Sequence, residues 1–163
     1  MKSPWEEISL ADYENHMKLD SVMQLQAMNQ MMKEQFETYP ISSVMILGIA
    51  GGNGLEHVSK SKFERIYEVD VNSSYLEEVI LRYPDLDGLL ECLCINLIDE
   101  TDKLPKADMV IANLLIEYIG YECFQEAIQH VNPKYVSINY HTIRTLEHML
   151  PNGKKLVQVD FER

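Results

Sequence analysis

The feature that most constrains the fold is an apolar run that leads directly into a glycine-rich turn. Residues 44–47 are all apolar, and Gly51, Gly52 and Gly54 follow within seven positions. Such a run predicts a strand buried on both faces, as in a parallel sheet. Glycine lets a ligand approach the main chain, and a short helix predicted at 55–61 would point its free N–H groups at the same place. We therefore interpret this stretch as the front of a nucleotide-type binding site, and not as an ordinary strand-to-helix connection.

Strand and helix signals alternate along the rest of the chain. Apolar runs predict further strands at 65–70, 90–95, 108–113 and 135–140, and helical spacing of apolar residues predicts helices at 5–38, 76–83 and 124–131. Strands that alternate with helices form a parallel sheet with right-handed crossovers. We therefore predict an α/β fold with a Rossmann-like, parallel-rich sheet and helices on both faces.

Composition limits the classes of partner. The 163 residues carry a formal net charge of −12, which repels phosphate backbones and anionic lipid. We expect neither nucleic acid nor a membrane as partner; a neutral or cationic small molecule fits better. The polar, acidic N-terminus resembles neither a secretory nor a transit signal, so we expect a cytoplasmic protein. Cys92, Cys94 and Cys123 have no metal-binding spacing, and we predict free thiols and no metal.

An acidic residue ends the second predicted strand. Asp70 follows the glycines by 15–20 residues, where a carboxylate accepts hydrogen bonds from a ribose diol in dinucleotide-type folds. The alternative is that Asp70 caps the next helix. Ser74 and Glu77 have the spacing of a capping box, which would leave Asp70 free to bind a ligand.

The segment ahead of the first strand lies outside this alternating core. Its apolar face predicts a packing helix, with methionines that adapt to irregular gaps. Because the segment could also fold over the sheet, Tyr13, His16 and Met17 are candidates for lining a site there.

Four motifs together resemble those of class I S-adenosylmethionine-dependent methyltransferases. They lie at 50–54, 67–76, 96–97 and 107–115, and the resemblance covers about residues 40–140. It implies that the acid of the second strand holds the adenosine ribose and that the fourth strand lies beside the transferred methyl group. It also implies that Asn96 and Leu97 contact adenine, with Asp99 as the alternative. With Tyr13 of the N-terminal segment added, the predicted cofactor contacts are Tyr13, Gly48, Ala50, Gly51, Gly52, Asn53, Gly54, Asp70, Val71, Asn96, Leu97, Asn113 and Leu114.

Two departures from the family pattern stand out. The family usually has an acidic residue where this chain has Gly48, and a glycine at Ala50; Glu56, Tyr13 or His16 could replace the missing acid. The chain also has little sequence after the fifth strand. We expect one domain spanning 1–163, made of a helical N-terminal cap (1–40), a cofactor-binding βαβ core (41–140) and a shortened C-terminal part (141–163).

The shortened C-terminal part is predicted to hold a short helix at 143–149 and a reduced, antiparallel closing strand within 150–161. The segment that usually precedes that strand is missing, which would expose an edge of the sheet. An exposed edge can pair with another chain, so a homodimer is possible.

The resemblance implies an enzyme that transfers a methyl group from S-adenosylmethionine to a small-molecule acceptor, leaving S-adenosylhomocysteine. In-line displacement depends mainly on alignment and exclusion of water, and a base is needed only if the acceptor loses a proton. His16, His141 and Tyr118 are the candidate bases, with Glu117 behind them.

Two other functions stay open. One is a protein that binds the cofactor without catalysis. The other is a nicotinamide-dependent oxidoreductase, weakened because His57 stands where the third fingerprint glycine is expected.

Overall fold

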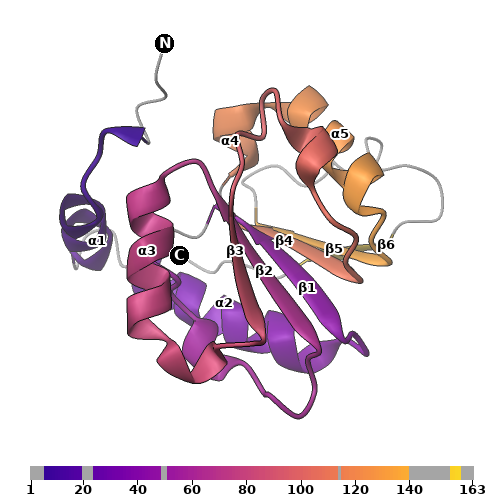
Figure 1. Cartoon of the computed structure of the whole chain (residues 1–163), viewed down its shortest axis with the longest axis horizontal. Helices are drawn as coiled ribbons and strands as arrows, with labels where there is room; N and C mark the ends of the chain where they lie inside the picture. The colour runs from indigo at the N-terminus through magenta and orange to yellow at the C-terminus, as the bar shows by residue number, and fades with distance from the viewer. Residues whose placement is uncertain (1–5, 20–23, 49–50, 114, 140–154, 159–163) are drawn as a thin grey trace.

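The computed structural model describes residues 6–19, 24–48, 51–113, 115–139 and 155–158. Its centre is a six-stranded sheet in the order β3-β2-β1-β4-β5-β6 (Figure 1). All neighbouring strands are parallel. The strands are β1 (Ser43–Leu47), β2 (Arg65–Asp70), β3 (Leu90–Cys94), β4 (Met109–Asn113), β5 (Tyr135–Asn139) and β6 (Lys155–Gln158). The predicted α/β class and the five predicted parallel strands are confirmed.

The sixth strand corrects one expectation. β6 pairs with β5 in parallel, with Tyr135 opposite Lys155, and not as the antiparallel closing strand that the family pattern implied. Fifteen residues, 140–154, separate the two strands. A connection of a dozen residues or more can cross back over the sheet, whereas a short turn would force the antiparallel arrangement. The helix predicted at 143–149 lies outside the described residues.

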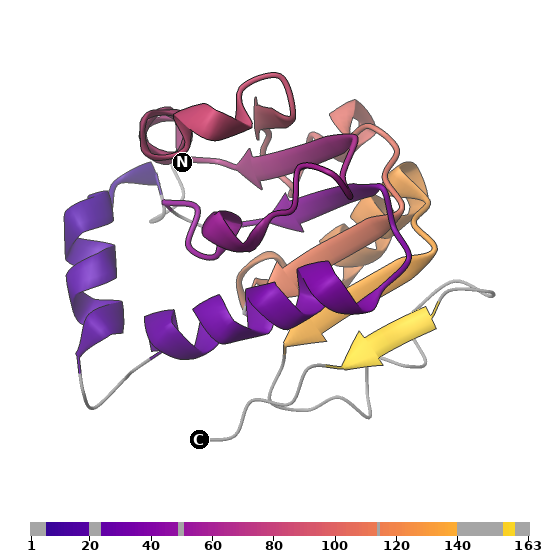
Figure 2. The ribbon, with the colours of Figure 1, turned by 90° about the horizontal axis from the view of Figure 1, so that it is seen from below.

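Helices cover both faces of the sheet, as predicted. α2 (Gln24–Thr38) and α3 (Ser73–Arg82) lie on one face, and α4 (Ile116–Ile119) and α5 (Tyr121–Val131) lie on the other (Figures 1 and 2). The N-terminal segment, predicted to be helical over 5–38, contains two separate helices, since α1 (Leu10–Lys18) ends before α2 begins. Within the described residues, no helix is both long and apolar enough to cross a membrane.

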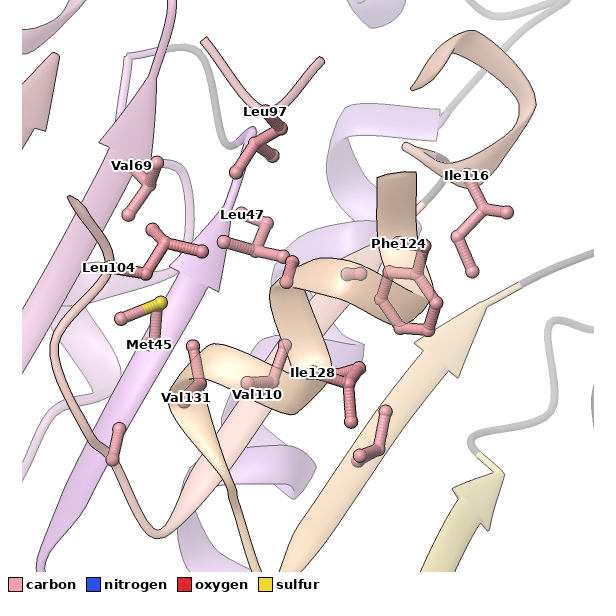
Figure 3. Packing of buried hydrophobic residues seen from close by; sticks show 14 of the residues in the cluster. Met45, Leu47, Val69, Leu97, Leu104, Val110, Ile116, Phe124, Ile128 and Val131 are labelled. Carbon is pink, nitrogen blue, oxygen red and sulfur yellow. The ribbon is translucent and has the colours of Figure 1, made fainter. Parts of the chain in front are cut away.

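The core on the α5 face is made of aliphatic side chains and one phenylalanine. Met45 and Leu47 of β1 pack with Val110 of β4 against Phe124 and Ile128 of α5 (Figure 3). The buried α5 residues are those that helical spacing picked out in the sequence. Burial of this stripe fixes α5 on the sheet, since each fully buried aliphatic side chain contributes about 1.5–3 kcal/mol.

The core on the opposite face depends on α2. Met32 and Phe36 are about 1% exposed and pack with Ile46 of β1 and Ile111 of β4. Phe36 also meets the ring of Phe63 edge-on, with 5.7 Å between ring centroids. α2 is therefore a layer of the fold, which agrees with the packing interpretation of its apolar face.

The helix predicted at 55–61 is reduced to one 3₁₀ turn, η2 (Leu55–His57). Val58 already has extended backbone angles, and the N–H of His57 bonds to the carbonyl of Gly54, three residues back. The position of α2 explains this, because its Met32 packs against Leu55 and lies directly over Gly54. A second helix has no sheet surface left to cover at this point.

Candidate cofactor-binding site

The glycine turn and Asp70 lie side by side at the carboxyl ends of neighbouring strands. Leu47 of β1 pairs with Val69 of β2, and the N–H of Gly48 donates to the carbonyl of Val69 at 2.8 Å. Open α/β sheets bind ligands at this edge. The structure therefore brings together two of the features that the sequence singled out separately.

Asp70 is a half-buried acidic group at this edge of the sheet. Burial raises its pKa to about 6, although hydrogen bonds from the main chain oppose this shift. Its Oδ1 accepts the N–H of Asn72 at 2.9 Å. Asn72 is the N-cap of α3 and accepts from the N–H of Ser74 at 3.0 Å. The predicted capping box at Ser74 is therefore wrong, because the cap lies two residues earlier. The conclusion that Asp70 does not cap the helix still holds.

Gly48 occupies a position that only glycine fits easily. Its φ is +74°, and a Cβ atom there would lie 2.8 Å from Cδ1 of Leu115. A side chain would be strained by the left-handed backbone and would also displace Leu115. The positive φ of Gly48 and the position of Leu115 therefore explain why an acidic side chain would not fit at this position.

The remaining glycines of the turn make room for side chains of the helices. A Cβ atom at Gly51 would lie 2.5 Å from Nη1 of Arg82, and one at Gly54 would lie 2.5 Å from Cβ of Met32. A Cβ atom at Gly52 would lie 3.0 Å from Cε2 of Tyr83. Close packing against α2 and α3 therefore accounts for part of the glycine content that the sequence analysis assigned to ligand approach.

The polar side chains after the turn are bound to α2. Asn53 donates to the carbonyl of Leu25 at 2.7 Å and accepts from Asn29 at 3.0 Å. Glu56 accepts from the same Asn29 and from the N–H of Gly54, at 3.1 Å for the latter. These bonds close the turn against α2. The side chains of Asn53 and Glu56 are thereby committed, and Glu56 is not placed to replace the acid missing at Gly48.

Asn113 ends β4 inside a buried polar network. Its side-chain oxygen accepts from Nε2 of Gln35 at 3.0 Å, and its Nδ2 donates back to Gln35 at 3.1 Å. Gln35 also donates to Ser137 of β5 at 2.7 Å. A ligand contact at Asn113 would therefore have to come from its main chain.

The predicted adenine contacts separate into a core residue and a loop residue. Leu97 is 6% exposed and points into the core beside Leu47 and Val69 (Figure 3). Leu97 follows the end of β3, and its side chain packs in the apolar core instead of facing a ligand. Asn96 is half-buried in the loop, and its Oδ1 accepts the N–H of Ile98 at 3.0 Å. Val71, half-buried, follows Asp70 at the end of β2.

Tyr13 of α1 lies close enough to Asp70 to interact with its charge. Burial raises its pKa to about 12, and the nearby Tyr118, Tyr75 and Asp70 add to the shift. Tyr118 of α4 is 57% exposed, and His16 of α1 is also exposed. The structure thus brings Tyr13 toward Asp70 but leaves His16 at the surface.

Several predicted positions lie outside the described residues, namely Ala50, Leu114 and His141, and the side chains of Met17 and Glu117 are not described either. In the part of the chain that the structure describes, no group of three His, Cys, Asp or Glu side chains could hold a metal ion.

Sequence reasoning missed two residues at this edge, Glu14 and Arg82. Arg82 donates to both carboxylate oxygens of Glu14, at 2.6 and 2.7 Å, and its Nη1 lies 3.5 Å from the carbonyl of Gly51. Its spacing from Glu78 suggests an ordinary pair within one helix, so nothing in the sequence indicated a contact with α1.

A scan against protein-family models found no match for this chain, and no curated protein matches its sequence significantly. Solved structures do match, and methyltransferases are among them. TrmN from Thermus thermophilus is 15% identical over 77% of this chain and 41% of its own, with a TM-score of 0.57. The methyltransferase domain of bacterial CtHen1-C is 19% identical over 76% and 74%, also at 0.57.

A S-adenosylmethionine-dependent methyltransferase from Clostridium acetobutylicum is 14% identical over 91% of this chain and 54% of its own, with a TM-score of 0.52. The chain thus spans less than two thirds of TrmN and of the Clostridium protein. At these identities the likeness concerns the fold. This chain has the fold of the class I S-adenosylmethionine-dependent methyltransferases.

Proposed function

We propose that this protein binds S-adenosylmethionine beside β1 and β2 and transfers its methyl group to a small-molecule acceptor. The observation that carries the proposal is that Asp70, at the end of β2, lies beside the glycine turn at the end of β1. No α-helix follows this turn within residues 51–64. A carboxylate at this position accepts both hydroxyl hydrogens of a ribose, which the adenosyl group provides. The methyltransferase fold supports the same ligand.

The short helix after the glycine turn favours S-adenosylmethionine over a nicotinamide dinucleotide as the ligand. Nicotinamide cofactors place their pyrophosphate on the N-terminus of the helix that follows the glycine turn. Here that helix is the three-residue η2, and His57 at its end bonds through Nε2 to Asn29 at 2.7 Å. S-adenosylmethionine has no phosphate and does not need such a helix. We therefore favour methyl transfer over the oxidoreductase.

The residues of the chain would act mainly by positioning. When bound, the cofactor supplies an electrophilic methyl group, and alignment with exclusion of water accelerates its transfer. Tyr13 keeps its proton at neutral pH, as any tyrosine with the ordinary pKa of about 10 does, and burial raises its pKa further to about 12, so it would serve as a hydrogen-bond donor and not as a base. The net charge of −12 favours a neutral or cationic acceptor.

Calorimetry of the purified protein against S-adenosylmethionine, S-adenosylhomocysteine and NAD tests the proposal. We expect both adenosyl ligands to bind and NAD not to bind. Asp70→Ala should weaken S-adenosylhomocysteine binding by more than about tenfold, which corresponds to about 1.4 kcal/mol. Binding of NAD alone would contradict the proposal, and unchanged affinity in a folded Asp70→Ala variant would remove Asp70 from the site.

A cofactor-binding protein without catalysis is the second candidate, and Gly48 favours it. Leu115 fills the space where a family acid would extend from this position. Labelled S-adenosylmethionine incubated with a small-metabolite extract distinguishes the two functions. Tight binding with no label in any acceptor would favour the second.

The homodimer stays a prediction. The two edges of the described sheet are β3 and β6, and light scattering of the purified protein would give its oligomeric state.

A further inference from the structure

We propose that α1 is a cap latched over the cofactor site by Arg82, and that the ion pair between Arg82 and Glu14 controls how fast the cofactor enters and leaves. The inference rests on the proposed function for the identity of the ligand. The contacts that define the cap and its latch join α1 to α3 and to the glycine turn, and they do not depend on the identity of the ligand.

The latch is a two-pronged ion pair between helices far apart in sequence. Nη1 and Nη2 of Arg82 lie 2.7 and 2.6 Å from the two oxygens of Glu14. This geometry matches the planar guanidinium to the carboxylate, and it makes the pair stronger than a single contact. The hydrogen bonds from Arg82 lower the pKa of Glu14, so the pair stays charged at neutral pH. The side chains are 36% and 15% exposed, which leaves the pair accessible to salt.

Arg82 also touches the glycine turn. Its Nη1 lies 3.5 Å from the carbonyl of Gly51, and a Cβ atom at Gly51 would collide with the same nitrogen. Leu10 of α1 comes within 3.2 Å of that Cβ position. One guanidinium therefore joins α1, α3 and the turn.

A second polar contact holds the chain just ahead of α1. The hydroxyl of Tyr75 on α3 donates to the carbonyl of Ile8 at 2.6 Å. Tyr13, one turn further along α1, lies close enough to Asp70 to interact with its charge. α1 is thus fastened at the side of the site where the ribose is expected.

α1 is less buried than the helices of the sheet layers, with Leu10 and Tyr13 only half-buried. Among its described side chains none is fully buried, in contrast to α2, α3 and α5. Its attachment therefore depends on the Arg82 pair and the Tyr75 bond to a greater degree than that of any helix in the sheet layers. A helix attached in this way can detach while the core stays folded.

Hydrogen exchange of the ligand-free protein tests the latch without a cofactor. Glu14→Ala removes the pair, and the higher helix propensity of alanine offsets the loss of the attraction between Glu14 and Lys18 within α1. Glu78→Ala is the matched control, because it removes the other carboxylate on Arg82, 3.2 Å from Nε, and leaves the cap pair intact. We expect the α1 amides to exchange about fivefold faster in Glu14→Ala and in Arg82→Met, and to be unchanged in Glu78→Ala. Unchanged exchange in both latch variants would overturn the latch.

Stopped-flow release of S-adenosylhomocysteine tests the role in ligand exchange. Both latch variants should release it at least about fivefold faster than the wild type, and raising the salt concentration should accelerate the wild type toward them. Faster α1 exchange with unchanged release would overturn the control of ligand entry while leaving the proposed function standing. If the wild type binds no adenosyl ligand, the proposed function and the ligand role fail together, and hydrogen exchange still decides whether the cap is latched.

Discussion

Glu68 is a buried acid whose replacement should stabilise the protein. It lies in the middle of β2, opposite Ile46 of β1 and Cys92 of β3, and it is 0% exposed. Neither carboxyl oxygen has a hydrogen-bond partner among the described residues. Burial raises its pKa well above the ordinary value, and the nearby charge of Asp70 adds to this shift.

The expected gain has two parts. A buried polar group left without a partner costs about 1–3 kcal/mol, so Glu68→Met, which keeps an unbranched side chain, should raise the free energy of unfolding by that amount. For a domain of this size, each kcal/mol corresponds to about 2–4 °C in Tm.

The second part depends on pH, and its sign follows from proton binding. Below the ordinary pKa of 4.5, the folded and unfolded states both hold the proton of Glu68. Above it the unfolded state releases the proton and the folded state keeps it, so wild-type stability falls with a slope of up to about 1.4 kcal/mol per pH unit, until the pH reaches the folded pKa. The methionine variant lacks this loss. Its advantage should therefore be smallest near pH 4 and grow toward pH 7.

Urea unfolding of both proteins at pH 4.5, 6 and 7.5 measures the difference. Glu91→Met is the matched control, since Glu91 is an exposed residue of β3 whose partner Arg65 lies 3.9 Å away. The control should change stability by less than about 0.5 kcal/mol at every pH. A Glu68→Met variant less stable than the wild type at pH 7.5 would mean that the carboxyl has a partner in the folded protein. A gain that does not change with pH would refute the raised pKa.

Three further predictions concern the site. Affinity for S-adenosylhomocysteine should fall about tenfold per pH unit below about pH 6, because Asp70 has a pKa of about 6 and only its ionised form accepts both ribose hydroxyls. Calorimetry from pH 5 to 7.5 measures this fall, and an affinity that does not change with pH would exclude Asp70 as the ribose ligand. Gly54→Ala should lower Tm more than Gly88→Ala, since both glycines have a positive φ but only Gly54 would collide with Met32; equal losses in thermal unfolding would refute the packing role. Gln35→Leu should cost about 1–3 kcal/mol in urea unfolding, because Oδ1 of Asn113 and the hydroxyl of Ser137 lose their bonds to Gln35 and Nδ2 of Asn113 keeps only its contact with the sulfur of Met32; a neutral result would contradict that network.

The sheet could be predicted from sequence because its strands are short apolar runs buried on both faces. The predicted bounds of β2 agree with the structure, and those of β1, β3, β4 and β5 agree to within one residue. The direction of β6 was wrong because it was carried over from the family pattern. Its sequence fits either direction, and the 15-residue connection is long enough for a crossover.

That Asp70 lies beside the glycine turn was also predictable, because the carboxyl ends of neighbouring parallel strands meet at one edge of the sheet. The orientation of Asn113 was also within reach. It has the same two-residue period on β4 as Met109 and Ile111, both of which face α2. The Arg82–Glu14 pair could not be predicted from the sequence. It joins two helices across 68 positions of the chain, and no pattern in either helix indicates its partner.

The glycine turn carries less information about the ligand than its composition suggests. Gly51, Gly52 and Gly54 each adjoin a side chain of α2 or α3, so the turn needs glycine whether or not a ligand is bound. The helix that would turn such a sequence into a phosphate site is absent from residues 51–64, because α2 already covers that part of the sheet. Under the proposed function, selectivity for an adenosyl ligand would therefore have to come from groups around the turn. Asp70 is the strongest candidate among these, because it is a half-buried acid at the adjoining strand end, and within the described residues its carboxylate accepts hydrogen bonds only from the main chain of Val71 and Asn72. A mutational test of the site should begin with Asp70 and not with the glycines, since replacing a glycine would disturb packing and binding together.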